Sequence, residues 1–190
     1  QVFDWLHKRG ATTFSQMTNL SAGLREMLAE RYTIVSLREV TRLASAQDET
    51  VKFLFALPDG NVVESVWMKY KHGNTLCISS QVGCRMGCKF CASTLLGLKR
   101  NLTANEIFAQ ILVAQWELRQ DRMSDKPIRP NGDPNNNDVS HIVIMGVGEP
   151  LDNFDNVLKF SFSNKLIASL LLLDDKIKSI SMSLRCFSLL

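Results

Sequence analysis

The spacing of apolar residues near the start of the chain predicts two short helices, over residues 2–9 and 21–31. Both segments alternate apolar and polar positions at the period of an amphipathic helix. Ser21 is a suitable N-cap for the second helix, because its hydroxyl can accept a hydrogen bond from a backbone N–H of the first turn. One face of this helix is expected to carry Leu24, Leu28 and Tyr32.

Residues 33–69 have a different pattern, rich in β-branched and aromatic side chains, which favours strands. The segment LPDGN at 57–61 interrupts this pattern and is a turn signal between two of these strands. We therefore expect a small α+β module over residues 1–72. It would be an accessory, RNA-binding-like module attached to the domain formed by residues 73–190.

Apolar runs and amphipathic segments alternate from residue 73 onward. NTLCISS is a short apolar run, and residues 102–120 predict a long helix whose Thr103 and Glu106 form a capping box. A proline-rich stretch then leads to VSHIVIMG, a nearly continuous apolar run typical of a buried parallel strand. NFDNVLKFSF opens another helix.

This order of strand, loop, helix, loop, strand and helix predicts an α/β fold with a parallel sheet or barrel. We expect residues 73–190 to form an incomplete core domain, a partial parallel (βα) barrel. In such folds the chemistry lies at the carboxyl ends of the strands. A cysteine-rich segment at 77–93 and the sequence GVGEP at 146–150 each follow a predicted strand, so both are expected on that face.

Composition narrows the class of protein. Hydrophobic residues make up 45% and charged residues 22%, as in ordinary globular domains, and no run of eighteen apolar residues predicts a membrane span. The chain has no visible signal peptide and does not begin with Met, so we expect it to start inside a larger protein. A reducing cytoplasm is then the expected compartment, where clustered cysteines more often bind metal or act in catalysis than form disulfides.

Positive charge gathers around the cysteine-rich segment. Residues 65–105 contain six Lys or Arg and no Asp or Glu, whereas residues 1–64 carry a net −1 and residues 106–190 a net −2. Such a local excess can attract an anionic cofactor or an RNA backbone. A solvated basic face is an equally good interpretation of the charge alone.

Cys84, Cys88 and Cys91 have the spacing C-x3-C-x2-C. Three thiolates on one loop can bind three irons of a 4Fe–4S cluster and leave the fourth iron open to another ligand. Gly83 and Gly87 would let the backbone wrap closely around the cluster, and Arg85 and Lys89 could offset its negative charge.

Two other interpretations of the cysteines stay open. Cys77 could join the other three in an all-cysteine zinc site, although structural zinc more often uses two separated C-x2-C pairs. The cysteines could also be small buried side chains without a ligand.

The motifs resemble a known family. CRMGCKFC is the signature of radical S-adenosylmethionine enzymes, and the longer segments TLCISSQVGCRMGCKFCASTLLGLKRNLTANEI and HIVIMGVGEPLDNFDNV resemble the 23S rRNA adenine-C2 methyltransferases that also act on tRNA. The resemblance extends back to QVFDWLHKRG and MTNLSAGLRE and covers about residues 1–160.

The resemblance implies a role for several residues. Cys84, Cys88 and Cys91 would bind the cluster, with S-adenosylmethionine on the fourth iron through its amino and carboxylate groups. Gly148 and Glu149 match the family's cofactor-binding pair, although GVGEP alone would be interpreted as an ordinary tight turn.

Three further residues also take their roles from the resemblance. Glu64 falls where the family has its proposed proton acceptor, and Cys77 matches a cysteine that forms a transient disulfide with a methyl-carrying cysteine late in the chain. Without the resemblance, Glu64 is a surface strand residue and Cys77 a small buried thiol. Ser183, in SISMSL, is a weak match for a further cofactor contact.

The family pattern ends after NVLKF, and the context of the methyl-carrying cysteine is absent; Cys186 is the one candidate left, and nothing around it matches. We therefore expect either a fragment or a frameshifted product that does not turn over by itself.

The implied activity of the parent enzyme is methylation of carbon 2 of adenosine in 23S rRNA and tRNA. The resemblance implies that one S-adenosylmethionine would methylate a protein cysteine, and that a second would be cleaved at the cluster to a 5′-deoxyadenosyl radical that activates the carried methyl group. The implied partners are these RNAs and an electron donor such as flavodoxin or ferredoxin, and the implied state is a cytoplasmic monomer without membrane contact. Methylation at carbon 8, of the antibiotic-resistance type, and a non-catalytic iron–sulfur or zinc-binding RNA-binding remnant are the alternatives.

Overall fold

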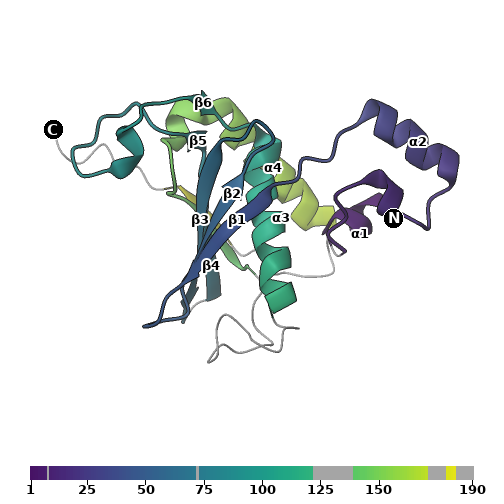
Figure 1. Cartoon of the computed structure of the whole chain (residues 1–190), viewed down its shortest axis with the longest axis horizontal. Helices are drawn as coiled ribbons and strands as arrows, with labels where there is room; N and C mark the ends of the chain where they lie inside the picture. Colours follow the sequence, from purple (N-terminus) through teal and green to yellow (C-terminus); the bar gives the residue numbers. More distant parts are fainter. Residues whose placement is uncertain (8, 72, 122–138, 171–178, 183–190) are drawn as a thin grey trace.

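The computed structural model describes residues 1–190 except 8, 72, 122–138, 171–178 and 183–190. Within these residues, a six-stranded sheet of order β1-β2-β3-β4-β7-β8 forms the centre of the molecule (Figure 1). Its strands are β1 (Arg38–Ala44), β2 (Val51–Ala56), β3 (Val62–Tyr70), β4 (Gly73–Cys77), β7 (His141–Ile144) and β8 (Ser179–Met182). Strands β1 to β4 are antiparallel neighbours, whereas β4, β7 and β8 run parallel.

The predicted turn between two strands is confirmed at the β2–β3 hairpin. Leu57 N–H donates to the carbonyl of Asn61 at 2.8 Å, and Gly60 N–H donates to the carbonyl of Leu57 at 3.0 Å. Gly60 has φ +82°, a backbone conformation that glycine adopts at little cost. The Asp59 carboxylate accepts from Asn61 N–H at 3.0 Å and closes the turn.

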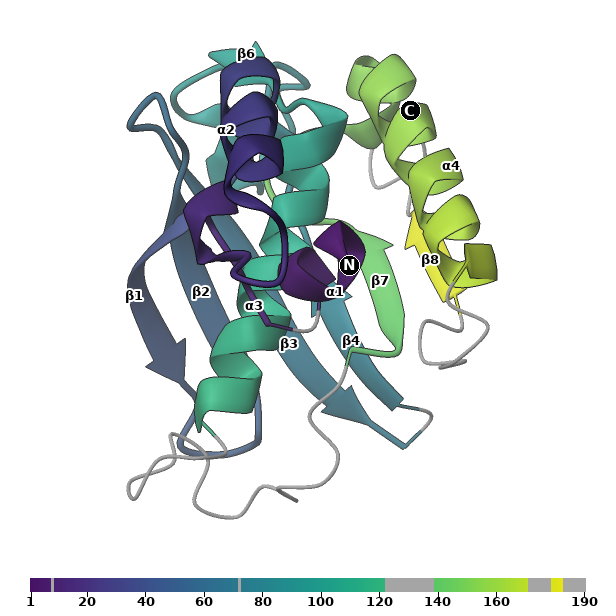
Figure 2. The same cartoon turned by 90° about the vertical axis from the view of Figure 1, so that its right-hand side faces the viewer.

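Helices α3 (Ala104–Asp121) and α4 (Phe154–Leu170) cover the same face of the sheet (Figure 2). The main core lies between them and the strands. Its fully buried large side chains include Phe53, Phe55, Trp67, Ile142 and Phe160. Because strand side chains alternate, the residues between these core positions point to the opposite face, where Glu64 and Cys77 lie half-buried.

The predicted capping box of α3 is confirmed. Thr103 Oγ1 accepts from Glu106 N–H at 3.3 Å, and Glu106 Oε2 accepts from Thr103 N–H at 2.9 Å. Glu106 also binds Arg100 through both carboxylate oxygens, at 2.9 and 2.7 Å. Arg100 in turn donates to Asp59 at 2.6 Å, so the start of α3 is tied to the β2–β3 turn.

The N-terminal residues form a second, smaller cluster around Met17, which is fully buried. Helices α1 (Val2–His7), η1 (Phe14–Gln16) and α2 (Ala22–Arg31) surround it. Ser21 caps α2 as predicted, accepting from Leu24 N–H at 3.3 Å. The predicted apolar face of α2 is used only in part: Leu28 packs on the cluster, but Leu24 is 38% and Tyr32 61% exposed.

A two-stranded sheet of β5 (Gln81–Val82) and β6 (Arg100–Asn101) joins β4 to α3. The loop between these strands contains the short helix η2 (Ala92–Thr94) and projects from the side of the molecule opposite α2 (Figure 1). It carries the cysteine motif, so two short strands hold both ends of that loop.

The expected α/β class with parallel strands is confirmed by β4, β7 and β8. The predicted division into modules at residue 72 stays a prediction; β3 and β4 pair directly across it, with Tyr70 opposite Gly73. None of the described helices has the length and apolar character needed to span a membrane.

Candidate active site

The cysteine loop is closed at its base by glycines. Gly83 has φ +75°, and a Cβ at this position would lie 1.9 Å from the Gly97 carbonyl oxygen, so the two ends of the loop can approach only because residue 83 has no side chain. Within the loop, Cys91 N–H donates to the Cys88 carbonyl at 3.1 Å, and Cys91 precedes η2. Cys84 is buried at the base of the loop.

Cys84, Cys88 and Cys91 line one cavity of about 60 Å³. The opposite wall comes from the end of β7 and the loop after it, including Gly146, Gly148 and Glu149. Parallel α/β sheets place loops that follow neighbouring strands at one edge, and that arrangement is found here. The cysteines and the GVGEP segment, predicted to share a face, are therefore brought together.

These residues fit a 4Fe–4S cluster in chemistry and position, because three cysteine side chains line the same cavity. Among the described residues, no group of three His, Cys, Asp or Glu side chains already surrounds a metal position. Cys84 and Cys91 are free thiols.

The GVGEP turn packs tightly against the strands behind it. A Cβ on Gly146 would lie 2.8 Å from the carbonyl carbon and oxygen of Ile78. Gly148 has φ +107°, and a Cβ there would lie 2.6 Å from the Cβ of Gln81. The Glu149 carboxylate accepts from Leu151 N–H at 3.1 Å and caps η3 (Pro150–Asn153). The turn therefore needs both glycines to lie where it does.

Glu64 and Cys77 lie on the sheet face that α3 and α4 leave uncovered. Cys77 is paired with Val66 across the β3–β4 ladder, two positions along β3 from Glu64, so the two side chains share a face. The Glu64 carboxylate forms an ion pair with Lys52 at 2.9 Å. Neither residue lines the cysteine cavity.

Comparison with known proteins matches this chain to one group of enzymes. Residues 1–34 match the family model described as the ribosomal RNA large subunit methyltransferase N-terminal domain. Over 160 residues the chain is 51% identical to a probable dual-specificity RNA methyltransferase RlmN of Desulforamulus reducens and 49% identical to one of Clostridium novyi. These matches cover 84% of this chain and 41% and 42% of the two relatives.

A solved structure agrees. The crystal structure of a radical SAM methyltransferase from Sphaerobacter thermophilus is 32% identical, with a TM-score of 0.70, and the match covers 95% of this chain and 48% of that one. This chain is homologous to the dual-specificity RNA methyltransferases. The resemblance found in the sequence is thereby confirmed, and the chain spans about two fifths of the length of the curated relatives.

A buried amide that the sequence did not single out joins three elements of this methyltransferase-like core. Gln110, on α3, accepts from Ser65 Oγ at 3.0 Å and from Ser79 N–H at 2.9 Å. Ser79 Oγ donates to the Glu64 carbonyl at 2.7 Å and accepts from Val147 N–H at 3.0 Å. The strand that carries Glu64 is thereby linked to the GVGEP turn.

A second polar cluster, also missed by sequence reasoning, connects the turn with the cysteine loop. Gln81 accepts from Glu149 N–H at 2.8 Å and donates to Asp152 at 2.9 Å, and Asp152 pairs with Arg85. The hydrogen bond from Arg85, followed by that from Gln81, holds the pKa of Asp152 below its usual value. Arg85 is thus already paired with a carboxylate, whereas the sequence suggested that it offsets cluster charge.

Two residues considered at the sequence level, Ser183 and Cys186, lie outside the described part of the chain. The cofactor contact suggested for Ser183 stays a prediction, as does the conclusion that Cys186 is not the methyl-carrying cysteine.

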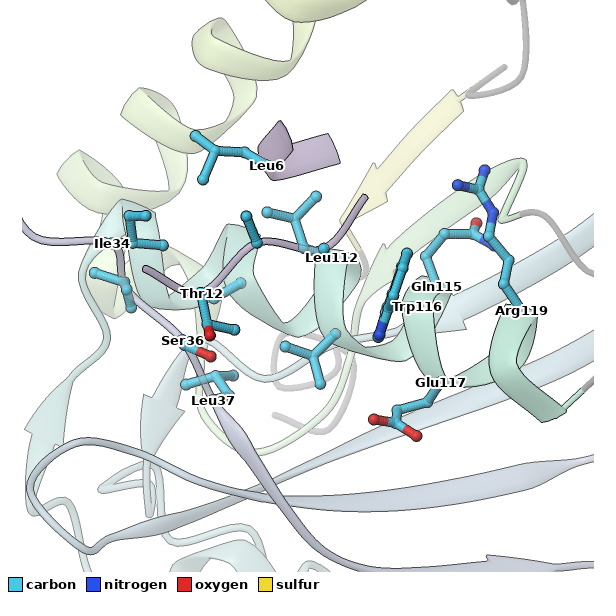
Figure 3. A pocket seen from close by; sticks show the side chains of 15 residues that line it. Leu6, Thr12, Ile34, Ser36, Leu37, Leu112, Gln115, Trp116, Glu117 and Arg119 are labelled. Atoms are coloured by element: carbon cyan, nitrogen blue, oxygen red, sulfur yellow. The ribbon is translucent and has the colours of Figure 1, made fainter. Parts of the chain in front are cut away.

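A separate cavity of about 240 Å³ lies between the N-terminal segment and α3 (Figure 3). Trp116 lines it from α3, and a Cβ on Gly10 would lie 2.6 Å from the Trp116 ring. Leu6 and Ile34 lie on its N-terminal side. None of its lining residues is a cysteine or belongs to the GVGEP turn, so it marks where the N-terminal residues pack on the core.

Proposed function

We propose that this chain is the cluster-binding part of a radical S-adenosylmethionine enzyme that methylates carbon 2 of adenosine in 23S rRNA and tRNA. One observation carries the proposal: the three cysteines of the C-x3-C-x2-C motif line a single cavity with Gly148 and Glu149. Homologues named as dual-specificity RNA methyltransferases support the substrate class.

In this proposal Cys84, Cys88 and Cys91 hold a 4Fe–4S cluster through their thiolates. When bound, the cluster and S-adenosylmethionine supply the one-electron chemistry needed to methylate an electrophilic ring carbon. Gly148 lets the turn pack against Gln81 beside the cavity, since any side chain at this position would collide with Gln81. The Glu149 carboxylate, beside the same cavity, would bind the methionyl ammonium, and Ser183 would add a contact.

The uncovered face of the sheet would receive the adenine. Glu64 would accept the ring proton there, as a base must lie within hydrogen-bond reach of the proton it removes. Its carboxylate pairs with Lys52 at 2.9 Å, so substrate binding has to share or displace that ammonium group. Cys77, on the same face, would form the transient disulfide with a methyl-carrying cysteine elsewhere in the parent protein.

The basic segment supports RNA binding less strongly than its composition suggests. Lys69 pairs with Glu49 at 2.9 Å, Arg85 pairs with Asp152, and Arg100 pairs with Asp59 and Glu106. The remaining three of the six basic residues are exposed: Lys71, Lys89 and Lys99. We propose these three as phosphate contacts.

The remaining features of the proposal concern the parent protein. It would act as a monomer in the cytoplasm, where its RNA substrates are, and receive electrons from a flavodoxin or ferredoxin. Methylation at carbon 8 is the nearest alternative, and product analysis of adenosine methylated by the parent enzyme separates the two positions.

Anaerobic reconstitution of the reduced chain with iron and sulfide tests the proposal. We expect about four irons and four sulfides per chain and an EPR signal that changes when S-adenosylmethionine is added. Cys91→Ser should lose the cluster, whereas Cys77→Ser, outside the cavity, should keep it. Retention of zinc in place of iron, with or without Cys77, would contradict the radical mechanism and favour a metal-stabilised RNA-binding module.

A further inference from the structure

Gln81 lies between the two halves of the candidate active site, and its side chain is fully buried. We propose that Gln81 is a positioning residue that, through Asp152 and Arg85, holds the GVGEP turn in a set position relative to the cysteine loop. The nature of the ligand rests on the function proposed above. The coupling between the two loops does not, and it can be measured without a cofactor.

The amide of Gln81 uses both of its polar atoms. Oε1 accepts from the backbone N–H of Glu149 at 2.8 Å. Nε2 donates to Asp152 Oδ2 at 2.9 Å and to Asn101 Oδ1 at 2.8 Å. The backbone N–H of Gln81 also donates to the Val147 carbonyl at 3.1 Å. The turn is therefore fastened to this one residue by main chain and side chain together.

Asp152 passes the connection on to the cysteine loop. One carboxylate oxygen accepts from Gln81, and the other pairs with the guanidinium of Arg85, which directly follows Cys84. The Asp152 side chain is 11% exposed, so solvent has little access to weaken these hydrogen bonds, although Arg85 is 64% exposed. The backbone N–H of Asp152 donates to the Glu149 carbonyl at 3.1 Å, which fixes Asp152 to the turn.

Only an amide of this length satisfies all these partners. A carboxylate at residue 81 could still accept from Glu149 N–H, but it would place a second negative charge against Asp152. A methionine would fill nearly the same volume and provide no N–H donor. The partly buried N–H of Glu149 would then lose its acceptor, which is costly where water cannot replace it.

Amide hydrogen exchange of the reduced, metal-free chain tests the coupling directly. In Gln81→Met we expect exchange of residues 146–149 and 84–91 to become about tenfold faster, the change that follows from losing about one hydrogen bond. Arg85→Met, at an exposed side chain, should not prevent folding and should also speed exchange of residues 146–149. The double variant should be no faster than the more affected single variant, because both changes break one connection.

Gln115→Met is the matched control. Gln115 also accepts from a backbone N–H, that of Val139, at 2.7 Å, but it lies on α3 and lines the separate cavity beside the N-terminal segment. Exchange of residues 84–91 and 146–149 should therefore stay at the wild-type rate in this variant. The coupling is overturned if Arg85→Met speeds exchange only in residues 84–91. It is also overturned if Gln81→Met leaves the exchange rate of residues 146–149 unchanged.

Spectroscopy of the reconstituted chain then distinguishes positioning from simple loss of structure. Gln81→Met should bind as much iron as wild type but need about tenfold more S-adenosylmethionine for the half-maximal EPR change. An unchanged cofactor requirement would overturn the positioning role. If the wild-type chain itself binds no iron, the proposed function fails, and the exchange data decide the coupling independently.

Discussion

Gly148 combines an unusual backbone conformation with tight packing. Its φ of +107° lies in the region that L-residues rarely adopt, and an added Cβ would lie 2.6 Å from the Gln81 side chain. We expect Gly148→Ala to lower the free energy of unfolding by roughly 2–4 kcal/mol, combining backbone strain with overpacking. Urea unfolding at neutral pH measures this change.

Gly60→Ala separates the contribution of backbone strain from that of overpacking. Gly60 has φ +82° in the β2–β3 turn, but nothing lies within 4 Å of an added Cβ. This variant should cost only about 1–2 kcal/mol, the strain of a left-handed conformation. Equal losses in the two variants would mean that Gln81 and the turn move apart easily, which would contradict the tight packing described above.

Among single residues, the cysteines were the easiest to select as candidate ligands from the sequence, because a ligand spacing is local. Gln81, Gln110 and Asp152 could not be found in the same way. Their partners on other elements lie 20 to 71 residues away in the chain, and isolated Gln and Asp residues have no local pattern. A polar residue inside an apolar run, such as Gln110 in the α3 sequence, was the one available signal.

At the scale of elements, α3 depends on its cap more than α2 does. Thr103→Ala removes the hydroxyl that accepts from Glu106 N–H at 3.3 Å, so the free energy of unfolding should fall by about 1 kcal/mol. Ser21→Ala removes a similar 3.3 Å bond at the start of α2. Because α2 buries no side chain fully, we expect this change to loosen α2 with little effect on global unfolding.

Circular dichroism and urea unfolding compare the two caps. The prediction fails if Ser21→Ala costs as much global stability as Thr103→Ala. The pattern of α2 predicted an apolar face that the fold uses only at Leu28. Periodicity shows which side chains share a face, but not whether another element covers it.

At the scale of the molecule, the ion pairs predict acid sensitivity. Burial raises the pKa of Glu106, but the hydrogen bonds from Arg100 and Thr103 outweigh it, so the pKa lies below its ordinary value of 4.5. The folded chain thus binds a proton at this site less readily than the unfolded chain. The ion pair adds stability above about pH 4.5, and this contribution is lost as pH falls through the lower folded value.

Glu106→Gln tests this linkage. The variant should be less stable than wild type at pH 7, by roughly 1–2 kcal/mol, and the difference should shrink by pH 3. Glu26→Gln, at an exposed position on α2, serves as the control and should change stability little at either pH. Urea unfolding at pH 7 and pH 3 measures the difference in stability between wild type and variant. A difference that grows on acidification would contradict the lowered pKa of Glu106 in the folded chain.

The sequence by itself determined the local features: the helix caps at Ser21 and Thr103, the β2–β3 turn and the spacing of the cysteines. Each depends on residues within a few positions of one another, where propensity and hydrogen-bonding geometry act directly. Only the tertiary structure decided that Cys84, Cys88 and Cys91 share a cavity with Gly148 and Glu149, and that Glu64 and Cys77 share a sheet face. Those placements follow from strand order and register, which are set by packing of the whole core rather than by any local pattern.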